Sequence, residues 1–368
     1  EFVESTKYNR SYASLILSKY GRAVWNGKLR IVGDITTIRR RVRERYYDGK
    51  VLAALRKIWV ILDWICGKRL AAAIPEVVVV LERAGEIRLD KQTREKLLKI
   101  SAATIDRLLA ADRKKLQIKG KSHTKPGSLL KSQIPIRRFD KWNEGKPGFV
   151  EIDLVGHDGG NSSGEFCFTL DVTDIFTRWT ETRAVKNKAQ VWVFKALEYI
   201  IKLLPFALLG IDSDNGSEFI NAHLLRYCQQ QKITFTRARP YRKNDNCFVE
   251  ERNNSIVRRA VGYQRYDTDD QLKTLNELYS LLRLYTNYFQ PVMKLIKKER
   301  VGSKVKKVYD KPQTPYHRVL ASADVSDLQK RKIRNEYTGL NPAQLKREIS
   351  RLQEKLAASG RRKEKRRA

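Results

Sequence analysis

The stretch Phe149-Val-Glu-Ile-Asp-Leu-Val155 alternates apolar and acidic side chains. A period of two is typical of a β-strand, in which successive side chains point to opposite faces of a sheet. Val150 and Ile152 then share one face, and Glu151 and Asp153 share the other. The run therefore predicts a strand that opens an α/β domain and carries a carboxylate at Asp153.

Two further carboxylates stand in equally recognisable settings. Asp214 ends the run Leu208-Leu-Gly-Ile-Asp-Ser-Asp214 and is followed by the turn pair Asn215-Gly216. Thirty-five residues separate Asp214 from Glu250, which lies in a segment of helical type. Carboxylates are hard oxygen ligands that suit Mg²⁺ or Mn²⁺, and three of them can hold two ions about 3.5–4 Å apart. The spacing predicts a metal-dependent site for phosphoryl transfer.

The elements expected around these carboxylates follow one order, with three strands first and then alternating helices and strands. After the Asp153 strand we expect strands at 166–176 and 178–185, a helix at 188–204, the Asp214 strand, a helix at 217–231, a strand at 233–239 and the helix of Glu250. Neighbouring strands lie about 4.7–4.9 Å apart, so carboxylates at adjoining strand positions can share one site.

This combination resembles the retroviral integrase-like DDE transposases and integrases, whose catalytic domain has the ribonuclease H-like fold. The resemblance covers roughly Phe149 to Tyr263 and rests on Glu151-Ile-Asp153, on Asp214-Asn-Gly-Ser-Glu-Phe219, and on Val249-Glu250 with Asn253. It implies that Asp153, Asp214 and Glu250 are the catalytic metal ligands, that two Mg²⁺ ions are the cofactor with Mn²⁺ as a substitute, and that a bacterial insertion sequence is the closest type of element. The His/Cys zinc domain of retroviral members is missing, because the four His and four Cys show no zinc-site spacing.

Helical geometry distinguishes Glu250 from its neighbour Glu251. Each helical residue turns by about 100°, so Glu250 lies at the border of the face that Val249 packs on the sheet, and Glu251 points away toward solvent. We interpret the other acids nearby as structural rather than as ligands, since Asp214 alone is followed by an Asn-Gly turn that lets a backbone approach closely. These other acids are Asp171, Asp174, Asp212 and Asp245.

Several residues near the carboxylates are candidates for DNA contact. Asn253 and Arg258 are expected to face the substrate strand from the helix of Glu250. A basic loop at 239–244 precedes that helix, with Arg239, Arg242 and Lys243 as candidates.

The charge of the chain indicates a polyanionic partner. The formal net charge is +34, from 75 Lys+Arg against 41 Asp+Glu. Residues 148–263 hold 15 Lys+Arg and 14 Asp+Glu, which leaves +33 on the flanking regions. We therefore expect the flanks to grip DNA. We see no signal peptide, no apolar run of membrane-spanning length and no dense cysteine pattern, and we expect a bacterial cytoplasmic, nucleoid-associated location.

The N-terminal half predicts all-α helix-turn-helix modules. Residues 1–48 are expected to belong to a helix-turn-helix unit that begins before Glu1, with 5–20 as its last helix. A basic run at 39–45 either contacts phosphates or a minor groove or is a solvated helix face. Residues 51–116 are expected to form a helical domain, since apolar residues recur every three or four positions from Leu52 to Ile65.

Within this domain the helix after Ser101 is the candidate recognition helix. Ser101 is its expected N-cap, Ile105, Leu108 and Leu109 face inward, and Ser101, Thr104 and Arg107 are candidates for base contacts. A plain helical bundle is the alternative.

Residues 117–145 predict an extended basic linker. Ten Lys or Arg and one acid occur between Arg113 and Lys141. The segment is either a solvated tether or follows a DNA backbone, with Lys121 as a phosphate contact; we favour the second because it joins two units that must hold the same duplex.

The C-terminal third predicts three parts. The catalytic domain, 146–290, is expected to end with a helix at 272–290. A small basic β-barrel is expected at 291–323, for which the resemblance implies DNA binding, with Lys304 as a contact. Residues 324–368 are expected to form a helix and a basic tail. The helix from Asn341 carries a one-sided stripe that meets either a second protomer or accessory protein or its own domain. The stripe consists of Leu345, Ile349, Leu352 and Leu356.

These observations predict a DDE transposase that binds the terminal repeats of a mobile element, cleaves at its 3′ ends and joins them to target DNA. Its expected partners are DNA and further copies of itself in a paired-end complex, with an accessory ATPase as a further candidate. One alternative is a catalytically silent DNA-binding regulator, against which the presence of all three carboxylates argues. The other is a ribonuclease H-like nuclease that cuts without joining, for which the N-terminal modules would be surplus.

Overall fold

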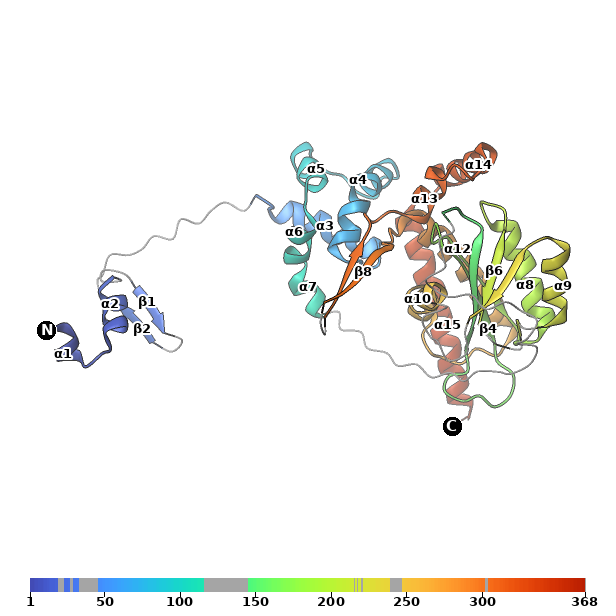
Figure 1. Cartoon of the computed structure of the whole chain (residues 1–368), viewed down its shortest axis with the longest axis horizontal. Coiled ribbons are helices and arrows are strands. Elements are labelled where there is room, and N and C mark those ends of the chain that lie inside the picture. The colour runs from blue at the N-terminus through green and yellow to red at the C-terminus, as the bar shows by residue number, and fades with distance from the viewer. Residues whose placement is uncertain are drawn as a thin grey trace. The chain divides into compact units, whose positions relative to one another are not determined.

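The computed structural model describes residues 1–18, 23–26, 29–32, 46–115, 145–214, 216, 218–219, 221–238, 247–301 and 304–367. The chain divides into two compact units, Glu1–Asp48 and Gly49–Ala368 (Figure 1). No helix in the described part is long and apolar enough to cross a lipid bilayer.

The first unit contains two short helices and a hairpin. Helix α1 spans Phe2–Thr6 and α2 spans Arg10–Ser18, while strands β1, Ala23–Asn26, and β2, Leu29–Val32, pair antiparallel. The expected single helix over 5–20 is wrong, because Lys7 is left-handed with φ 54° and ends α1. Asn9 then accepts a hydrogen bond from the amide of Tyr12 at 2.8 Å, which starts α2. The unit is therefore not all-α. The basic run at 39–45 lies outside the described residues.

A helical domain opens the second unit. It consists of α3, Gly49–Ile61, α4, Gly67–Arg83, α5, Lys91–Leu98, α6, Ala102–Leu108, and α7, Ala110–Lys115. The predicted stripe is confirmed, since Leu55, Ile58 and Leu62 are fully buried. Helices α4 and α6 approach closely at Gly67, where a Cβ would lie 2.5 Å from the carbonyl oxygen of Ala102. Any larger residue would push the two helices apart.

A mixed five-stranded sheet forms the centre of the catalytic domain. Its order is β5-β4-β3-β6-β7, with β3 antiparallel to β4 and parallel to β6. The strands are β3, Phe149–Gly156, β4, Phe168–Asp174, β5, Thr180–Val185, β6, Gly210–Ser213, and β7, Thr234–Arg237. The predicted order of strands and helices is confirmed, with strand and helix ends shorter than expected.

The two faces of the sheet differ in the way the alternation predicts. Val150 and Ile152 pack with α8, Gln190–Leu203, and α9, Ala222–Gln230, in one apolar core. The opposite face meets the helix of Glu250 and the long helix α12, Asp269–Phe289, which contacts β5. Asp153 and Asp214 therefore lie on or beside a rigid sheet, because burial on both faces leaves the strands little freedom.

The helical domain packs on the catalytic domain rather than standing apart from it. Tyr285 of α12 donates its hydroxyl to the carbonyl oxygen of Ile61 at 2.6 Å, and the Gln290 amide donates to the carbonyl oxygen of Leu62 at 2.9 Å. Lys346 forms an ion pair with Asp63 at 2.7 Å. The linker expected at 117–145 lies outside the described residues except for its last residue.

The C-terminal part contains a hairpin and three helices. Strands β8, Leu295–Val301, and β9, Lys304–Tyr309, pair antiparallel and form a sheet of their own, and α13, Pro315–Ala321, and α14, Asp327–Thr338, follow. The expected small barrel is not confirmed. The described part of 291–323 contains these two strands and one further isolated bridge, between Val292 and Gln313. Two strands cannot close a barrel.

The last helix, α15, Pro342–Arg367, docks on its own chain. It packs chiefly along α12, and its apolar stripe is buried there. The buried residues are Leu345, Ile349, Leu352 and Leu356. Of the two alternatives open from the sequence, the intramolecular one is therefore observed.

Candidate active site

Asp153 lies at the centre of the site, on the face of β3 that meets the helix of Glu250. Its Oδ1 accepts a hydrogen bond from the amide of Leu154 at 2.8 Å, and its Oδ2 accepts one from the side-chain amide of Asn253 at 2.6 Å. Burial, followed by the charges of Asp214 and then Glu250, raises the pKa of Asp153 to about 7 against these two hydrogen bonds. Asp214 and Glu250 are therefore each within electrostatic reach of Asp153.

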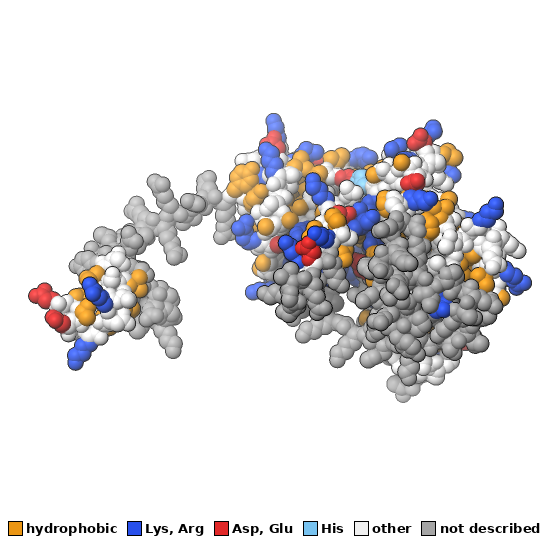
Figure 2. Space-filling view, viewed as in Figure 1, with side chains coloured by type: hydrophobic (Ala, Val, Ile, Leu, Met, Phe, Trp, Pro, Cys, Tyr) orange, Lys and Arg blue, Asp and Glu red, His pale blue; other side chains and the backbone are white. Residues whose placement is uncertain are grey.

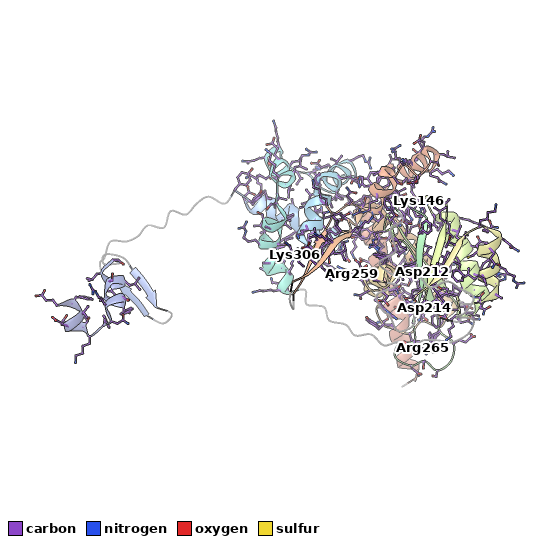
Figure 3. The ribbon with its side chains drawn as sticks, in the orientation of Figure 1. Lys146, Asp212, Asp214, Arg259, Arg265 and Lys306 are labelled. Atoms are coloured by element: carbon purple, nitrogen blue, oxygen red, sulfur yellow. The ribbon has the colours of Figure 1, made fainter. Side chains whose placement is uncertain are left out.

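Asp214 follows the last residue of β6. The parallel register pairs Ile152 of β3 with Ser213 of β6. Asp153 and Asp214 each come one residue after this pair, so they lie side by side. The carboxylate of Asp214 accepts a hydrogen bond from the amide of Gly216 at 2.8 Å, and burial, with the charge of Glu218, raises its pKa. Figure 3 labels Asp214 close to Asp212, a residue of β6.

Glu250 and Glu251 face different partners. Both side chains are exposed on α10, Cys247–Arg252, but only the charge of Glu250 acts on Asp153. The charge of Glu251 acts instead on the buried guanidinium groups of Arg252 and Arg178. Glu250 therefore remains the candidate for the third member of the carboxylate set.

The other acids that the structure describes have structural contacts, as interpreted. Asp174 accepts hydrogen bonds from the amides of Gly148 and Thr177, and Asp212 accepts one from the hydroxyl of Thr236. Asp171 lies directly opposite Asp153 in the sheet, where the hydroxyl of Thr173 donates to it. Asp245 lies outside the described residues.

A π-helical segment, η2, Asn253–Arg258, continues α10 and leads into α11, Arg259–Val261. Asn253 contacts Asp153, and the guanidinium of Arg258 donates to the carbonyl oxygen of Gly156 at 2.9 Å. A π-helix bonds residue i to residue i+5, so residues five apart lie nearly above one another. The π geometry therefore lets Asn253 and Arg258 both turn toward β3. Arg258, expected to face a substrate strand, is engaged with backbone carbonyls here.

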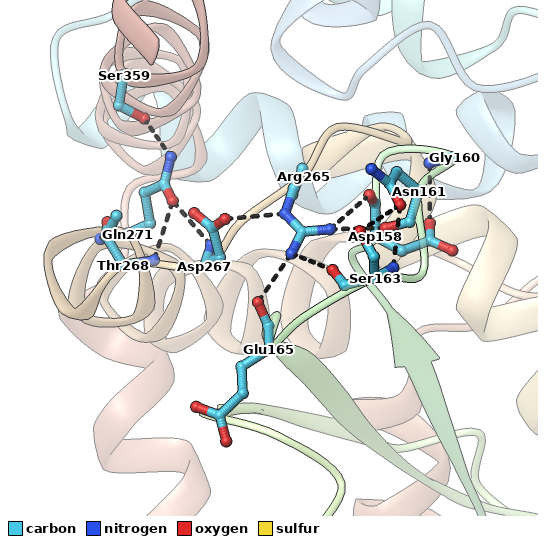
Figure 4. Close-up of polar contacts among 10 residues, drawn as sticks. All are labelled: Asp158, Gly160, Asn161, Ser163, Glu165, Arg265, Asp267, Thr268, Gln271 and Ser359. Carbon is cyan, nitrogen blue, oxygen red and sulfur yellow. Dashed lines mark hydrogen bonds and ion pairs between the residues drawn. The ribbon is translucent and has the colours of Figure 1, made fainter. Parts of the chain in front are cut away.

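Arg265 makes several contacts to the loop that follows β3 (Figure 4). Its guanidinium donates to the carbonyl oxygens of Asn161 at 2.6 Å, Ser163 at 2.8 Å and Glu165 at 3.0 Å, and forms an ion pair with Asp267 at 2.8 Å. The loop leaves the sheet three residues after Asp153, so Arg265 fixes the border of the site. Sequence reasoning missed Arg265, because its partners are backbone atoms about a hundred residues away.

His157, at the start of this loop, is not a candidate general base. It is fully buried, its Nε2 lies 2.7 Å from the hydroxyl of Thr169, and burial with the charge of Arg258 lowers its pKa to about 3. The ring is therefore neutral at physiological pH.

The donor set fits a divalent cation in its chemistry. Burial, and after it the charges of Asp214 and Glu250, raise the pKa of Asp153, and a cation held by these three carboxylates would relieve that repulsion. Their hard oxygen atoms suit Mg²⁺. Among the described residues, no three His, Cys, Asp or Glu side chains are already close enough together to hold a metal ion. Binding an ion would therefore require the three side chains to approach one another.

The candidates for DNA contact in the helical domain lie together. Ser101 is the N-cap of α6 and accepts from the amide of Thr104 at 3.2 Å, as predicted, and Arg107 donates to the Thr104 hydroxyl at 3.2 Å. Arg107 is exposed. A short turn joins α5 to α6. On the face shown in Figure 2, Lys and Arg side chains are spread over the second unit rather than gathered in one patch.

Lys121, Arg239, Arg242 and Lys243 lie outside the described residues, and Lys304 is the first residue of β9.

Comparisons with known proteins show the family of this chain. Residues 143–243 match the integrase core domain family. The uncharacterized protein y4rM of Sinorhizobium fredii (strain NBRC 101917 / NGR234) is 42% identical over 274 residues, 74% of this chain and 78% of that protein.

Two solved structures are similar at 16% identity. The catalytic core domain of BIV integrase covers 52% of this chain and 98% of its own, with a TM-score of 0.32. A simian T-cell lymphotropic virus intasome in complex with PP2A regulatory subunit B56 gamma covers 59% and 70%, with a TM-score of 0.34.

The chain belongs to the family of the Sinorhizobium protein, and its catalytic domain is an integrase core of the ribonuclease H-like DDE integrase and transposase superfamily.

Proposed function

We propose that this protein is a DDE transposase that binds the terminal repeats of a mobile DNA element, cleaves at their 3′ ends and joins these ends to target DNA. The observation that carries the proposal is the adjacent placement of Asp153 on β3 and Asp214 directly after β6, with the charge of Glu250 on α10 acting on Asp153. The integrase core family match over residues 143–243 supports the same reaction class.

In this proposal Asp153, Asp214 and Glu250 would hold two Mg²⁺ ions, for which Mn²⁺ would substitute. When bound, such ions stabilise the charge that develops on the attacking and leaving oxygens at phosphorus. The sheet holds Asp153 and Asp214 at fixed positions, and Asn253 orients the carboxylate of Asp153. No side chain of the site has to form a covalent bond to DNA, since water attacks in cleavage and the released 3′-OH attacks in joining.

The rest of the chain would hold the DNA. Arg107, with Ser101 and Thr104, would contact bases of the terminal repeat from α6, and the basic segments would contact phosphates. Because the helical domain packs on the catalytic domain, a repeat bound at α6 would lie at a defined distance from the carboxylates. Joining two ends requires at least two copies of the chain, so we propose a homo-oligomer that acts on bacterial chromosomal DNA. An accessory ATPase finds no support and is not part of the proposal.

The test uses the purified full chain and duplexes that end in the inverted repeats flanking its gene. In Mg²⁺, the expected products are duplexes cut at the 3′ end of the repeat and repeat ends joined to a supercoiled plasmid. Asp153→Asn should bind the duplex and give neither product, whereas Arg226→Ala, on the exposed surface of α9, should give both. Cutting without joining would identify a nuclease instead, and binding without either product would identify a regulator.

A further inference from the structure

A buried carboxylate outside the proposed metal ligands fastens the helix of Glu250 to the sheet. Glu151 is fully buried on β3, two residues before Asp153 and on the same face. Its Oε2 accepts hydrogen bonds from the amides of Phe248 at 2.8 Å and Val249 at 2.9 Å. These are the second and third residues of α10, the positions whose amides an N-cap side chain normally satisfies.

We propose that Glu151 is a positioning residue that sets the place of Glu250 relative to Asp153. The proposal rests on the proposed function for the role of those two carboxylates. Glu250 follows Val249 directly, so its backbone is one peptide bond from an amide that Glu151 holds. The same strand that presents one proposed ligand therefore fixes the helix that presents another.

The charged groups that act on Glu151 include an acid, Asp212, and a base, Arg178. In the register of β3 and β6 it pairs with Asp212, whose carboxylate is buried and repels it. On the other side, the guanidinium of Arg178 lies 3.6 Å from the centre of the Phe248 ring, within electrostatic reach of Glu151. Burial raises the pKa of Glu151 well above its ordinary value, against the hydrogen bonds from the α10 amides and the charge of Arg178. The two amide hydrogen bonds hold this side chain at the start of α10.

The contact is the first of three that join the helix to β3. Glu151 holds residues 248 and 249, Asp153 holds Asn253, and the Gly156 carbonyl holds Arg258. The helical segment therefore follows β3 from Glu151 to Gly156. Loss of the first contact would free the end that carries Glu250, while the other two would keep the helix attached.

The experiment compares Glu151→Leu and Glu151→Gln in the full chain. Leucine has a similar volume and no acceptor, so the variant should fold but lose the cap; glutamine keeps one oxygen acceptor and should retain part of it. Glu181→Leu is the matched control, because Glu181 is equally buried on β5 but contacts Trp179 and Arg283 instead of α10.

Hydrogen exchange without DNA or metal is the first readout, because it does not depend on the proposed activity. Peptides covering 247–252 should exchange about tenfold faster in Glu151→Leu than in wild type. The increase should be smaller in Glu151→Gln, and the exchange rate should be unchanged in Glu181→Leu. The second readout is the split between binding and turnover: Glu151→Leu should lower kcat about tenfold or more while the affinity for the repeat duplex stays within about twofold.

Unchanged exchange at 247–252 in Glu151→Leu would overturn the proposal, and so would equal acceleration in Glu181→Leu. Turnover and duplex affinity that fall together would assign Glu151 a general structural role. If the wild-type chain neither cut nor joined DNA, the proposed function would fail, while the exchange result would still decide whether Glu151 positions α10.

Discussion

The side-chain amide of Asn253 donates a hydrogen bond to Oδ2 of Asp153 over 2.6 Å, across one hundred residues of sequence. This bond joins the π-helical segment to β3 at the proposed ligand, and it restricts the carboxylate to one orientation. The Oδ1 atom of Asn253 is buried without a partner in the described structure, so the amide is oriented by Asp153 alone.

Replacing Asn253 with Ala should therefore lower activity without unfolding the chain. Loss of a residue that orients a metal ligand typically lowers activity or metal affinity by about 10–100-fold. The measurement is the Mg²⁺ concentration that gives half-maximal end cleavage, which should rise. Asn254→Ala, at the exposed neighbouring position, is the matched control and should behave as wild type. A wild-type Mg²⁺ requirement in Asn253→Ala would show that the hydrogen bond has no role at the site.

Glu250→Gln should abolish both end cleavage and strand transfer in Mg²⁺, because a neutral amide is a far poorer ligand than a carboxylate. Binding to the repeat duplex, measured by gel shift, should stay intact. Glu251→Gln should remain active, since the charge of Glu251 acts on Arg252 and Arg178 rather than on Asp153. The opposite pattern would mean that our assignment of the helix face is wrong.

Arg265→Ala should release the loop at 158–165 and destabilise the chain by about 2–3 kcal/mol, because several charge-assisted hydrogen bonds are lost together. Limited proteolysis within the loop should become faster. Arg226→Ala removes a single hydrogen bond to a helix carbonyl and should change neither stability nor cleavage by protease. Equal proteolysis of both variants would place the anchor of the loop elsewhere.

Acid should weaken the contact between α15 and the end of α4. The hydrogen bonds from Arg347 and then Asn341 lower the pKa of Glu86 to about 2. A lowered folded-state pKa adds stability above the unfolded pKa of about 4.3, and this stability is lost as the pH falls toward 2. Arg347 is 61% exposed, so we expect at most about 1 kcal/mol. Chemical unfolding of wild type and Glu86→Gln should differ at pH 6 and converge near pH 2; a constant difference would contradict this.

Arg107→Ala should reduce the preference for the element's own ends over random duplex by about 1–3 kcal/mol if Arg107 contacts a base. Lys121→Ala should weaken binding to both duplexes equally, because a phosphate contact carries no sequence information. Competition binding at fixed salt measures both. A uniform loss in Arg107→Ala would assign this side chain to the backbone of the DNA.

Local patterns were sufficient for much of the catalytic domain. The alternation around Asp153 predicted a strand, and in the structure Val150 and Ile152 share the face that packs on α8 and α9. The turn after Asp214 and the helix of Glu250 were recognisable for the same reason, since strand and helix periods act over a few residues. The N-cap at Ser101 was equally local.

Element ends and associations between distant segments were harder to predict. The helix expected at 5–20 breaks at Lys7, whose left-handed backbone leaves no mark in the apolar pattern. The sequence showed the apolar stripe of α15 but not that α12 covers it. An apolar face indicates burial and does not specify the surface that buries it. The barrel expected at 291–323 rested on resemblance and on two strands that do pair with each other.

The order of residues was enough to indicate three carboxylates on a strand, a turn and a helix, and with them the class of chemistry, because each lies in a short and regular context. Only the packed chain could show what holds them: Glu151 at the first turn of α10, Asn253 on Asp153 and Arg265 on four loop carbonyls. These contacts join segments about a hundred residues apart, where no local period operates and only the tertiary fold brings donor and acceptor together.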